Sequence, residues 1–356
     1  MLLSLLTLGI WSAWATVRNR RYIYGNTELA GNRFDFHGNP WAILRGRVLA
    51  VAFFLAYVIG GDFSVFVPAV TIVLLVILFP WMLASAMRFR LSNTSWRNLR
   101  FDFAASFRNS YAQLGLPLLL VLLTLTWFIV LKIQVEGSQT YIESLKWNGM
   151  AILLLLLASF FLVPLAIHRI RALTFNALRY GRHMFSANLR LTRFLGLYAL
   201  TSLVFIASMV VMIAIIFFLG KMTGGLDAAL IETVQGKRVG TMIIIYLVVI
   251  LCYLLPLAFW NVSTANYTFS AVELEGLKVS MEMDVWEYWW YLWTNAVVAA
   301  VSLGLAIPWT RIRMLRYKLS CLTVKGEFQV YHGHTTGRQA AAGDEIGDAF
   351  DIDFGF

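Results

Sequence analysis

Long uninterrupted runs of apolar residues dominate the pattern along the chain. A helix needs about 20 such residues to cross the hydrocarbon core of a bilayer. Seven runs are long enough, at about 1–20, 42–60, 64–87, 114–134, 147–168, 194–220 and 239–265. An eighth stretch, 286–310, contains Gly304 and Pro308, which favour a break or kink. The pattern therefore predicts a multi-pass helical membrane protein.

Short stretches of alternating apolar and polar residues follow the ends of several of these runs. Alternation around a central Gly or Asn is typical of a β-hairpin. Five hairpins are expected, at about 27–36, 94–103, 177–187, 269–281 and 322–331. Open strand edges are not tolerated in lipid. We therefore expect all five hairpins on one membrane face, where they can pair into small sheets or one collar.

Some residues recur at fixed offsets, which predicts internal repeats. At an offset of 67, residues 21–22 (RY) fall on 88–89 (RF), and the sequence RFDF at 33–36 falls on RFDF at 100–103. At an offset of 295, the RY of 21–22 falls on the RY of 316–317. Looser copies follow the runs that end near 168 and 265. Each copy combines an apolar helix, an exit turn with Arg and an aromatic residue, and a hairpin.

Composition and charge narrow the protein class and orient the chain. Of the 356 residues, 60% are hydrophobic and 13% are charged. Soluble domains average about 25% charged residues, so an ordinary soluble enzyme is excluded. Most basic residues, 24 of 29, lie in 18–47, 88–108, 169–193, 267–287 and 311–338. The positive-inside rule places these connections in the cytoplasm. Nucleic acid is not an expected partner, because the basic residues flank membrane helices instead of forming one soluble patch.

The predicted fold class is an all-α multi-pass membrane protein with seven or more transmembrane helices and repeated short cytoplasmic β-hairpins. About 30 residues separate the last two hairpins, too few for two full crossings at ~1.5 Å per residue. We favour a re-entrant helix pair in 286–310, bent near Leu303 and Gly304, over a single crossing. Residues 1–338 are expected to form one polytopic domain of about five degenerate repeats. An acidic, flexible cytoplasmic tail is expected at 339–356.

The N-terminal residues resemble a known family. Thr7-Leu8-Gly9-Ile10, then Trp14, Arg21-Tyr22 and Gly31-Asn32-Arg33-Phe34 are similar to the YjgN-like family of bacterial inner-membrane proteins. The resemblance runs through most of the chain. It implies a multi-pass helical fold and location in the bacterial inner membrane. It implies no reaction, because the family is a domain of unknown function.

Arg and aromatic residues at equivalent repeat positions are the first candidate site. An Arg at the inner interface can bind lipid phosphate or another anion. The alternative is that these side chains are interfacial anchors, with Arg reaching toward the headgroups beside an aromatic belt. The residues are Arg21, Tyr22, Arg88, Phe89, Arg171, Arg316 and Tyr317.

Polar residues within or near the apolar runs are the second candidate set. Ionisable groups in a span are functional hypotheses by default, and a buried Asn can line a polar path. The alternative is helix packing through interhelical hydrogen bonds. The set comprises His168, Asn261, Asn266 and Asn295.

No motif of catalysis, metal binding or cofactor binding is present, so we expect no enzyme activity, no metal and no cofactor. Because many spans and repeated elements are common in transporters, a transport or channel role for a small solute or lipid is the leading hypothesis. The alternative is a non-catalytic membrane scaffold that binds a protein partner or anionic lipid through its Arg-rich cytoplasmic hairpins. The expected partners are the bilayer, anionic lipids and a membrane-protein partner.

Overall fold

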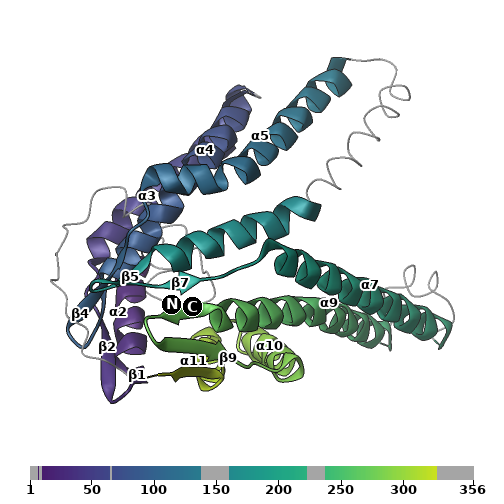
Figure 1. Cartoon of the computed structure of the whole chain (residues 1–356). Helices are drawn as coiled ribbons and strands as arrows, with labels where there is room; N and C mark the ends of the chain where they lie inside the picture. The colour runs from purple at the N-terminus through teal and green to yellow at the C-terminus, as the bar shows by residue number, and fades with distance from the viewer. Residues whose placement is uncertain (1–6, 8–9, 65, 138–159, 223–236, 327–356) are drawn as a thin grey trace. The chain divides into compact units, whose positions relative to one another are not determined.

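The computed structural model describes residues 7, 10–64, 66–137, 160–222 and 237–326. Over these residues the chain is mostly helical and carries small antiparallel sheets (Figure 1). It divides into two compact units. The first unit contains the described parts of Met1–Leu189, together with Val272–Leu277 and Gly326. The second unit contains the described parts of Arg190–Ala271, together with Lys278–Lys325. Each unit buries its own cluster of apolar side chains.

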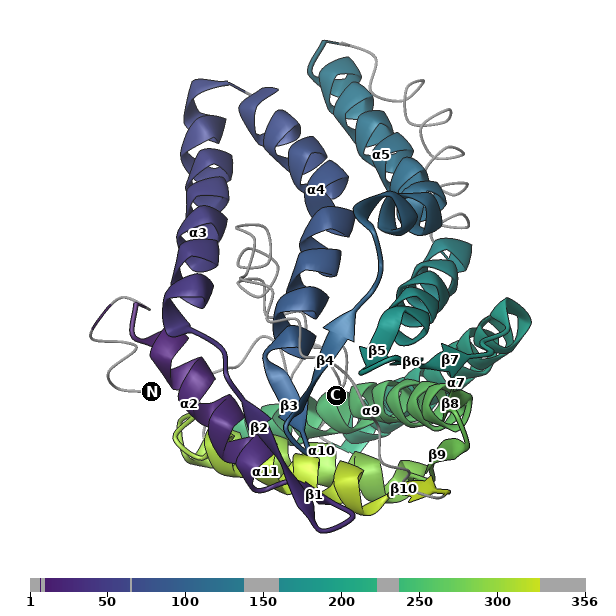
Figure 2. The same ribbon diagram turned by 60° about the vertical axis from the view of Figure 1, so that its left-hand side comes forward.

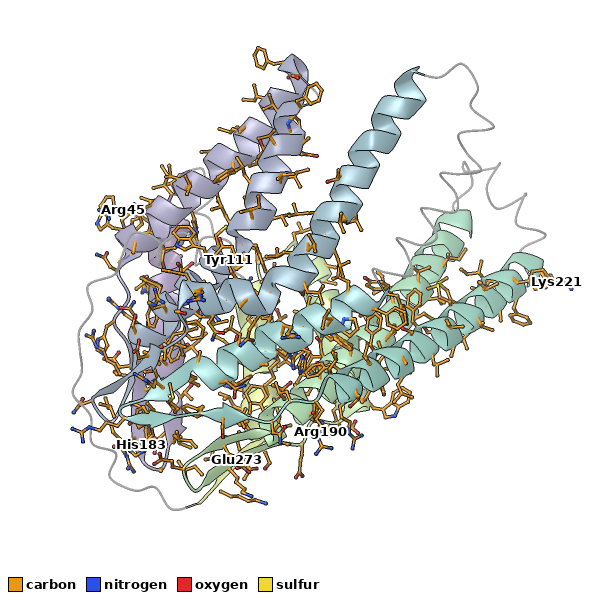
Figure 3. The ribbon with its side chains drawn as sticks, turned by 45° about the horizontal axis from the view of Figure 1, so that its top comes forward. Arg45, Tyr111, His183, Arg190, Lys221 and Glu273 are labelled. Carbon is orange, nitrogen blue, oxygen red and sulfur yellow. The ribbon has the colours of Figure 1, made fainter. Side chains whose placement is uncertain are left out.

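The helices of the first unit are α2 Ser12–Gly25, α3 Pro40–Phe63, α4 Phe66–Ser92, α5 Phe107–Gly137 and a helix of residues 160–177. Helix α3 begins at Pro40, and the Asn39 side chain before it accepts a hydrogen bond from the Trp41 N–H. Both are favourable at a helix start. The chain leaves along α3 and returns along α4 (Figure 2). The Tyr111 hydroxyl of α5 donates to the Ile77 carbonyl of α4 at 2.9 Å (Figure 3).

Six short strands of the first unit form one antiparallel sheet, ordered β1 to β6. Phe36 of β2 lies opposite Thr94 of β3, and Phe103 of β4 lies opposite Leu178 of β5. Hairpins that a helix pair separates in sequence are thus joined side by side. The strands are β1 Glu28–Leu29, β2 Asn32–Phe36, β3 Thr94–Trp96, β4 Leu99–Phe103, β5 Leu178–Tyr180 and β6 His183–Met184. A further strand, β7 Ser186–Ala187, pairs with β8 Val272–Leu274.

The first two hairpins share one turn geometry. Both central residues have positive φ: Ala30 and Gly31 in the first, Arg97 and Asn98 in the second. Two consecutive left-handed residues define the type I′ turn, whose twist matches that of antiparallel strands. Gly31 and Asn98 suit this conformation, whereas Arg97 adopts it against the usual preference.

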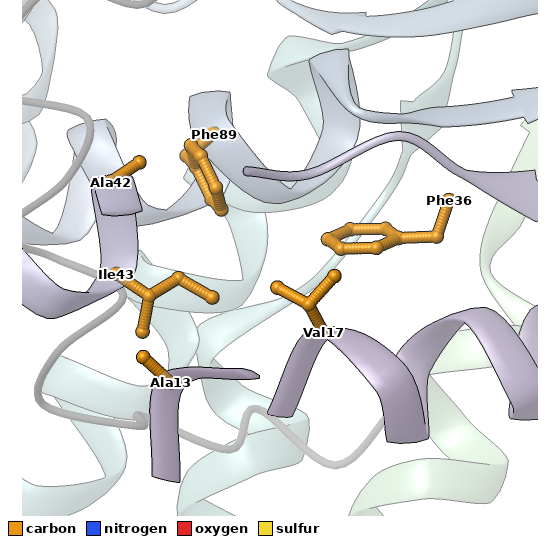
Figure 4. Packing of buried hydrophobic residues seen from close by; sticks show 6 residues of the cluster. All are labelled: Ala13, Val17, Phe36, Ala42, Ile43 and Phe89. Atoms are coloured by element: carbon orange, nitrogen blue, oxygen red, sulfur yellow. The ribbon is translucent and has the colours of Figure 1, made fainter. Parts of the chain in front are cut away.

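The core of the first unit lies where α2, β2, α3 and the end of α4 meet (Figure 4). Phe36 and Phe89 are its largest members, and Ala13, Val17, Ala42 and Ile43 complete it. A second cluster joins α4 to the β4 segment through Ala84, Met87, Phe103 and their neighbours. The hairpins are therefore anchored by the aromatic residues of their own alternating pattern.

The second unit contains α7 Leu191–Met222, α9 Lys237–Ser270, α10 Val285–Val301 and α11 Ile307–Ser320, with β9 Leu277–Met281 and β10 Leu322–Lys325. Strand β9 follows β8 in a hairpin and pairs with β10. The Asp284 side chain caps α10 by accepting from the N–H groups of Trp286 and Glu287. Between α10 and α11 the chain reverses at Leu303 and Gly304, both of positive φ, which is the bend that the sequence predicts.

Four helices of the described residues are long and apolar enough to cross a membrane: Pro40–Phe63, Phe66–Ser92, Leu191–Leu219 and Leu247–Ser270. They correspond to the runs expected at 42–60, 64–87, 194–220 and 239–265. Helix α5 covers the run at 114–134. Most of 1–9 and all of 147–159 lie outside the described residues, so the prediction of seven spans is tested only in part. Four expected hairpins are present. Of the fifth, β10 is described and 327–331 is not.

Candidate functional site

Arg21 and Arg88, predicted as anion sites, both bind backbone carbonyls in the structure. Arg21 donates from Nε to the Phe36 carbonyl and from Nη2 to the Gly38 carbonyl, each at 3.3 Å. Arg88 donates from Nη2 to the Ala105 carbonyl at 2.9 Å and lies over the Phe107 ring at 4.8 Å. In each copy, the Arg thus fastens the end of a helix to the chain that leaves the hairpin. Both contacts are structural, and they use some of the N–H donors of each guanidinium.

The aromatic partners of these arginines differ in burial. Phe89 has 2% of its surface exposed and packs in the core, whereas Tyr22 at the equivalent position is 58% exposed. The two residues therefore do not form equivalent ligand sites.

Arg171 and His168 lie on the helix of residues 160–177. Burial lowers the pKa of Arg171 to about 10. His168 Nε2 lies 2.9 Å from the Leu189 carbonyl. This contact holds the chain that leaves β7 against the helix, which is a packing role.

In the second unit, Arg316 is exposed, and its side chain forms no hydrogen bond or ion pair with the described residues. Its neighbour Tyr317 is buried. The Tyr317 hydroxyl exchanges hydrogen bonds with the Asp284 N–H and carbonyl at 3.1 Å, and its ring stacks on Tyr291. Burial raises the pKa of Tyr317. Tyr317 therefore fastens α11 to the start of α10.

The three candidate asparagines of the second unit have different surroundings. Asn266 binds both the Met283 N–H and the Met283 carbonyl at 2.9 Å, which fixes the chain after β9 to α9. Asn295 Oδ1 accepts from Arg313 Nη1 at 3.0 Å. Asn261 is half-buried, and its side chain makes no hydrogen bond among the described residues. They do not share one site.

A polar pocket of about 510 Å³ lies over the first two hairpins. Its lining, here named the hairpin pocket, comprises Asn32, Arg33, Asp35, His37, Ser95, Arg97, Asn98 and Arg100. None of these residues is among the predicted site residues. The alternation of the strands explains the pocket, because successive side chains point to opposite faces of a sheet. Phe34 and Phe36 face the helices, so Arg33 and Asp35 face away from them.

Strand register brings the pocket residues together. Asp35 lies opposite Ser95, and Ser95 lies opposite Arg100, so three strands contribute to one row. His37 Nε2 is 3.0 Å from Ser95 Oγ and 3.6 Å from Asp35 Oδ2. The Arg97 guanidinium lies over the Trp96 ring at 4.5 Å. Three arginines and one aspartate therefore line the pocket.

Similarity to known proteins extends over most of the chain. Residues 1–349 match the family described as "Bacterial protein of unknown function (DUF898)". The chain belongs to this family. "Inner membrane protein YjgN" of Salmonella typhimurium is 24% identical over 347 residues, which cover 92% of this chain and 84% of that protein. The protein of the same name in Escherichia coli K12 is 30% identical over 125 residues, 34% of this chain and 31% of that protein. No solved structure matches the chain significantly.

Membership in the DUF898 family confirms the resemblance carried by residues 7–36. The family description names no reaction and no ligand. Among the described residues, no three His, Cys, Asp or Glu side chains come together as a metal site.

The sequence contained a signal for the hairpin pocket that the prediction did not use. The repeated RFDF of 33–36 and 100–103 places an Arg and an Asp on the polar face of two strands. What it does not contain is the pairing of β2 with β3, which brings the two hairpins together.

Proposed function

We propose that the protein is a non-catalytic inner-membrane protein that holds anionic lipid at the cytoplasmic face through its Arg-rich hairpins. Two observations support the membrane location. Four described helices are long and apolar enough to cross a bilayer, and the relatives are named inner membrane proteins. The cytoplasmic side follows from the distribution of basic residues.

The arrangement of the first unit supports a position of the sheet at the membrane surface. Strand β2 ends at Phe36 and α3 begins at Pro40, while α4 ends at Ser92 and β3 begins at Thr94. Because β2 pairs with β3, the start of α3 and the end of α4 both lie next to the sheet. The two helices thus form an antiparallel pair that leaves the sheet and returns to it. A sheet so close to the ends of two spans lies within reach of lipid headgroups.

The single observation that carries the proposal is the charge of the polar face of this sheet. Arg33, Arg97, Arg100 and Arg179 lie on it, against Glu28, Asp35 and Asp102. Near an anionic leaflet each basic residue contributes about 1 kcal/mol of attraction. The excess of arginines therefore favours anionic over zwitterionic lipid.

The proposal includes α10 and α11 as a re-entrant pair, which enters one leaflet and returns to the same face. The chain reversal exposes Val301, Leu303 and Leu305, of which Leu303 is 92% exposed. Apolar side chains at such a tip are favourable in the acyl region of one leaflet. Arg313 lies nearer the other end of the pair, between the Tyr291 and Trp309 rings, where an interfacial Arg can reach headgroups.

Transport of a small solute or lipid stays a prediction from the number of spans. No contact among the described residues favours a path across the membrane. The seven spans, the five repeats, the tail at 339–356 and a membrane-protein partner likewise stay predictions.

The proposal is tested by analysing the lipids that co-purify with the full chain after mild extraction from its own membrane. We expect enrichment of anionic phospholipid over the bulk membrane, and loss of the enrichment at high salt. Co-purified lipid of bulk composition would overturn the proposal. A protein partner retained in place of lipid, and lost on deletion of residues 343–356, would support the protein-binding scaffold instead.

A further inference from the structure

The hairpin pocket has the donors of an anion site. Arg33 and Arg100 are exposed, and neither forms a hydrogen bond or ion pair with any described residue. Both line the pocket, and a guanidinium group offers a planar fork of N–H donors. The Ser95 hydroxyl and the amides of Asn32 and Asn98 add further donors at its wall.

The balance of charge in the pocket favours a dianion. Three guanidinium groups are opposed by the Asp35 carboxylate. That carboxylate already accepts from the Phe36 N–H at 2.7 Å and lies near His37. The single negative charge of Asp35 lowers the positive potential of the pocket without cancelling it. A ligand with two negative charges neutralises the excess.

The number and placement of donors favour phosphate over carboxylate. A carboxylate has two oxygens and is satisfied by one bidentate Arg. The pocket instead places Arg33, Arg97 and Arg100 on different strands and turns around one space. A phosphate monoester offers three terminal oxygens and a charge of about −1.5 to −2 at pH 7, so it can bind several guanidinium groups together.

Arg97 places a third guanidinium group beside this pocket. Its φ of 50° belongs to the type I′ turn, and Ala30 adopts the same conformation in the first hairpin. At this turn position the second hairpin carries an Arg that lines the pocket, and its guanidinium lies 4.5 Å from the centre of the Trp96 ring.

We propose that the hairpin pocket binds a terminal phosphate group, carried either by a lipid headgroup or by a small soluble phosphate. This inference rests on the proposed function in that it names the ligand group for one part of the same polar face. The volume of about 510 Å³ lies in the range of small-molecule sites, so the pocket has room for the group that bears the phosphate.

The test uses the full chain in detergent and in nanodiscs. Inorganic phosphate and glycerol 3-phosphate are titrated by calorimetry as soluble probes, and nanodiscs with phosphatidic acid or phosphatidylcholine test the lipid source. The double variant Arg33→Gln, Arg100→Gln should weaken phosphate binding by roughly 100-fold, which corresponds to about 2.8 kcal/mol, because it removes two charged donors from the pocket. The control is Arg193→Gln on α7, an exposed Arg without side-chain contacts among the described residues, which should bind like the wild type.

The outcomes are distinct. Pocket-dependent binding of the soluble probes supports a soluble ligand, and pocket-dependent binding of phosphatidic acid alone supports a lipid headgroup. Equal binding by the double variant and the wild type, or no binding of any probe, overturns the inference. Anionic lipid enrichment that persists in the double variant would leave the proposed function standing while this inference fails. Pocket-dependent phosphate binding without lipid enrichment would support the phosphate site and overturn the proposed lipid-holding function.

Discussion

Residues at equivalent positions of the repeats do not all have the same structural role. Tyr22 and Phe89 are separated by the offset of 67 that also relates Arg21 to Arg88. The arginines make the same contact, a hydrogen bond to the carbonyl 17 residues later, at Gly38 and Ala105. The aromatic residues do not, because Phe89 points into the core that α2 and α3 share, whereas Tyr22 lies on the exposed side of α2.

Substitution of Phe89 by Ala should strongly destabilise the first unit. Removal of a fully buried Phe side chain costs about 3–5 kcal/mol through lost burial and the cavity left behind. The matched control is Tyr22→Ala, which should change the free energy of unfolding by less than about 0.5 kcal/mol because surface positions are tolerant. Both values are measured by denaturant unfolding in mixed micelles. Equal effects of the two substitutions would contradict the burial of Phe89.

Substitution of Arg97 by Gly should separate stability from binding. Relief of the left-handed backbone favours the folded state by about 1 kcal/mol, offset in part by loss of the contact with Trp96. The melting temperature should therefore stay the same or rise, while phosphate affinity falls. A large drop in melting temperature would show that Arg97 serves the turn instead of the pocket.

At the scale of elements, helix ends are fastened to hairpins by single polar side chains. Arg21, Arg88, Asn266 and Tyr317 each bind backbone groups of a segment that follows a strand or precedes a helix. Burial of these backbone groups near the membrane makes their hydrogen bonds costly to lose. The same design recurs in both units, with Arg in one and Asn or Tyr in the other.

Replacement of Arg88 by Met should loosen β4 while leaving the helix intact. The substitution keeps an unbranched side chain but removes the bond to Ala105 and the contact with Phe107, about 1–3 kcal/mol together. Hydrogen exchange should show faster exchange in Leu99–Phe103 and little change in α4. The control is Arg90→Met in the same helix turn, whose half-buried side chain makes no hydrogen bond, ion pair or ring contact with the described residues. Equal exchange in the two variants would refute the role of Arg88.

The elements were largely predictable from the sequence, and their partners were not. Period-two alternation located four hairpins within a few residues, because side-chain period is a local property. The pairing of β2 with β3 depends on the return of α4 to the start of α3, which no local pattern encodes. The sequence suggests Arg21 and Arg88 as ligand residues, and the fold adds a structural contact of each with the segment after a hairpin. The sequence does not single out Arg33 and Arg100, which the pairing of β2 with β3 brings to one pocket.

At the scale of the whole molecule, the orientation in the membrane is the proposal most open to test. Reporter fusions at Gly326 should indicate the cytoplasm, and fusions at Lys146 or Asp227 the periplasm, because the basic connections alternate with poorly charged ones. The comparison of a cytoplasmic and a periplasmic reporter at each position supplies the control. A cytoplasmic location of Lys146 would contradict the orientation of every span.

The sheet of the first unit also constrains how the protein can be made. Strands β2 and β3 are separated by the two helices α3 and α4, so their pairing must wait until both helices have been synthesised and inserted. Until then the edge of β2 is open, and open edges invite pairing with other chains. We therefore expect assembly in two stages, first insertion of the helices and then closure of the sheet. A chain that ends before residue 94 lacks β3 and therefore leaves the β2 edge unprotected.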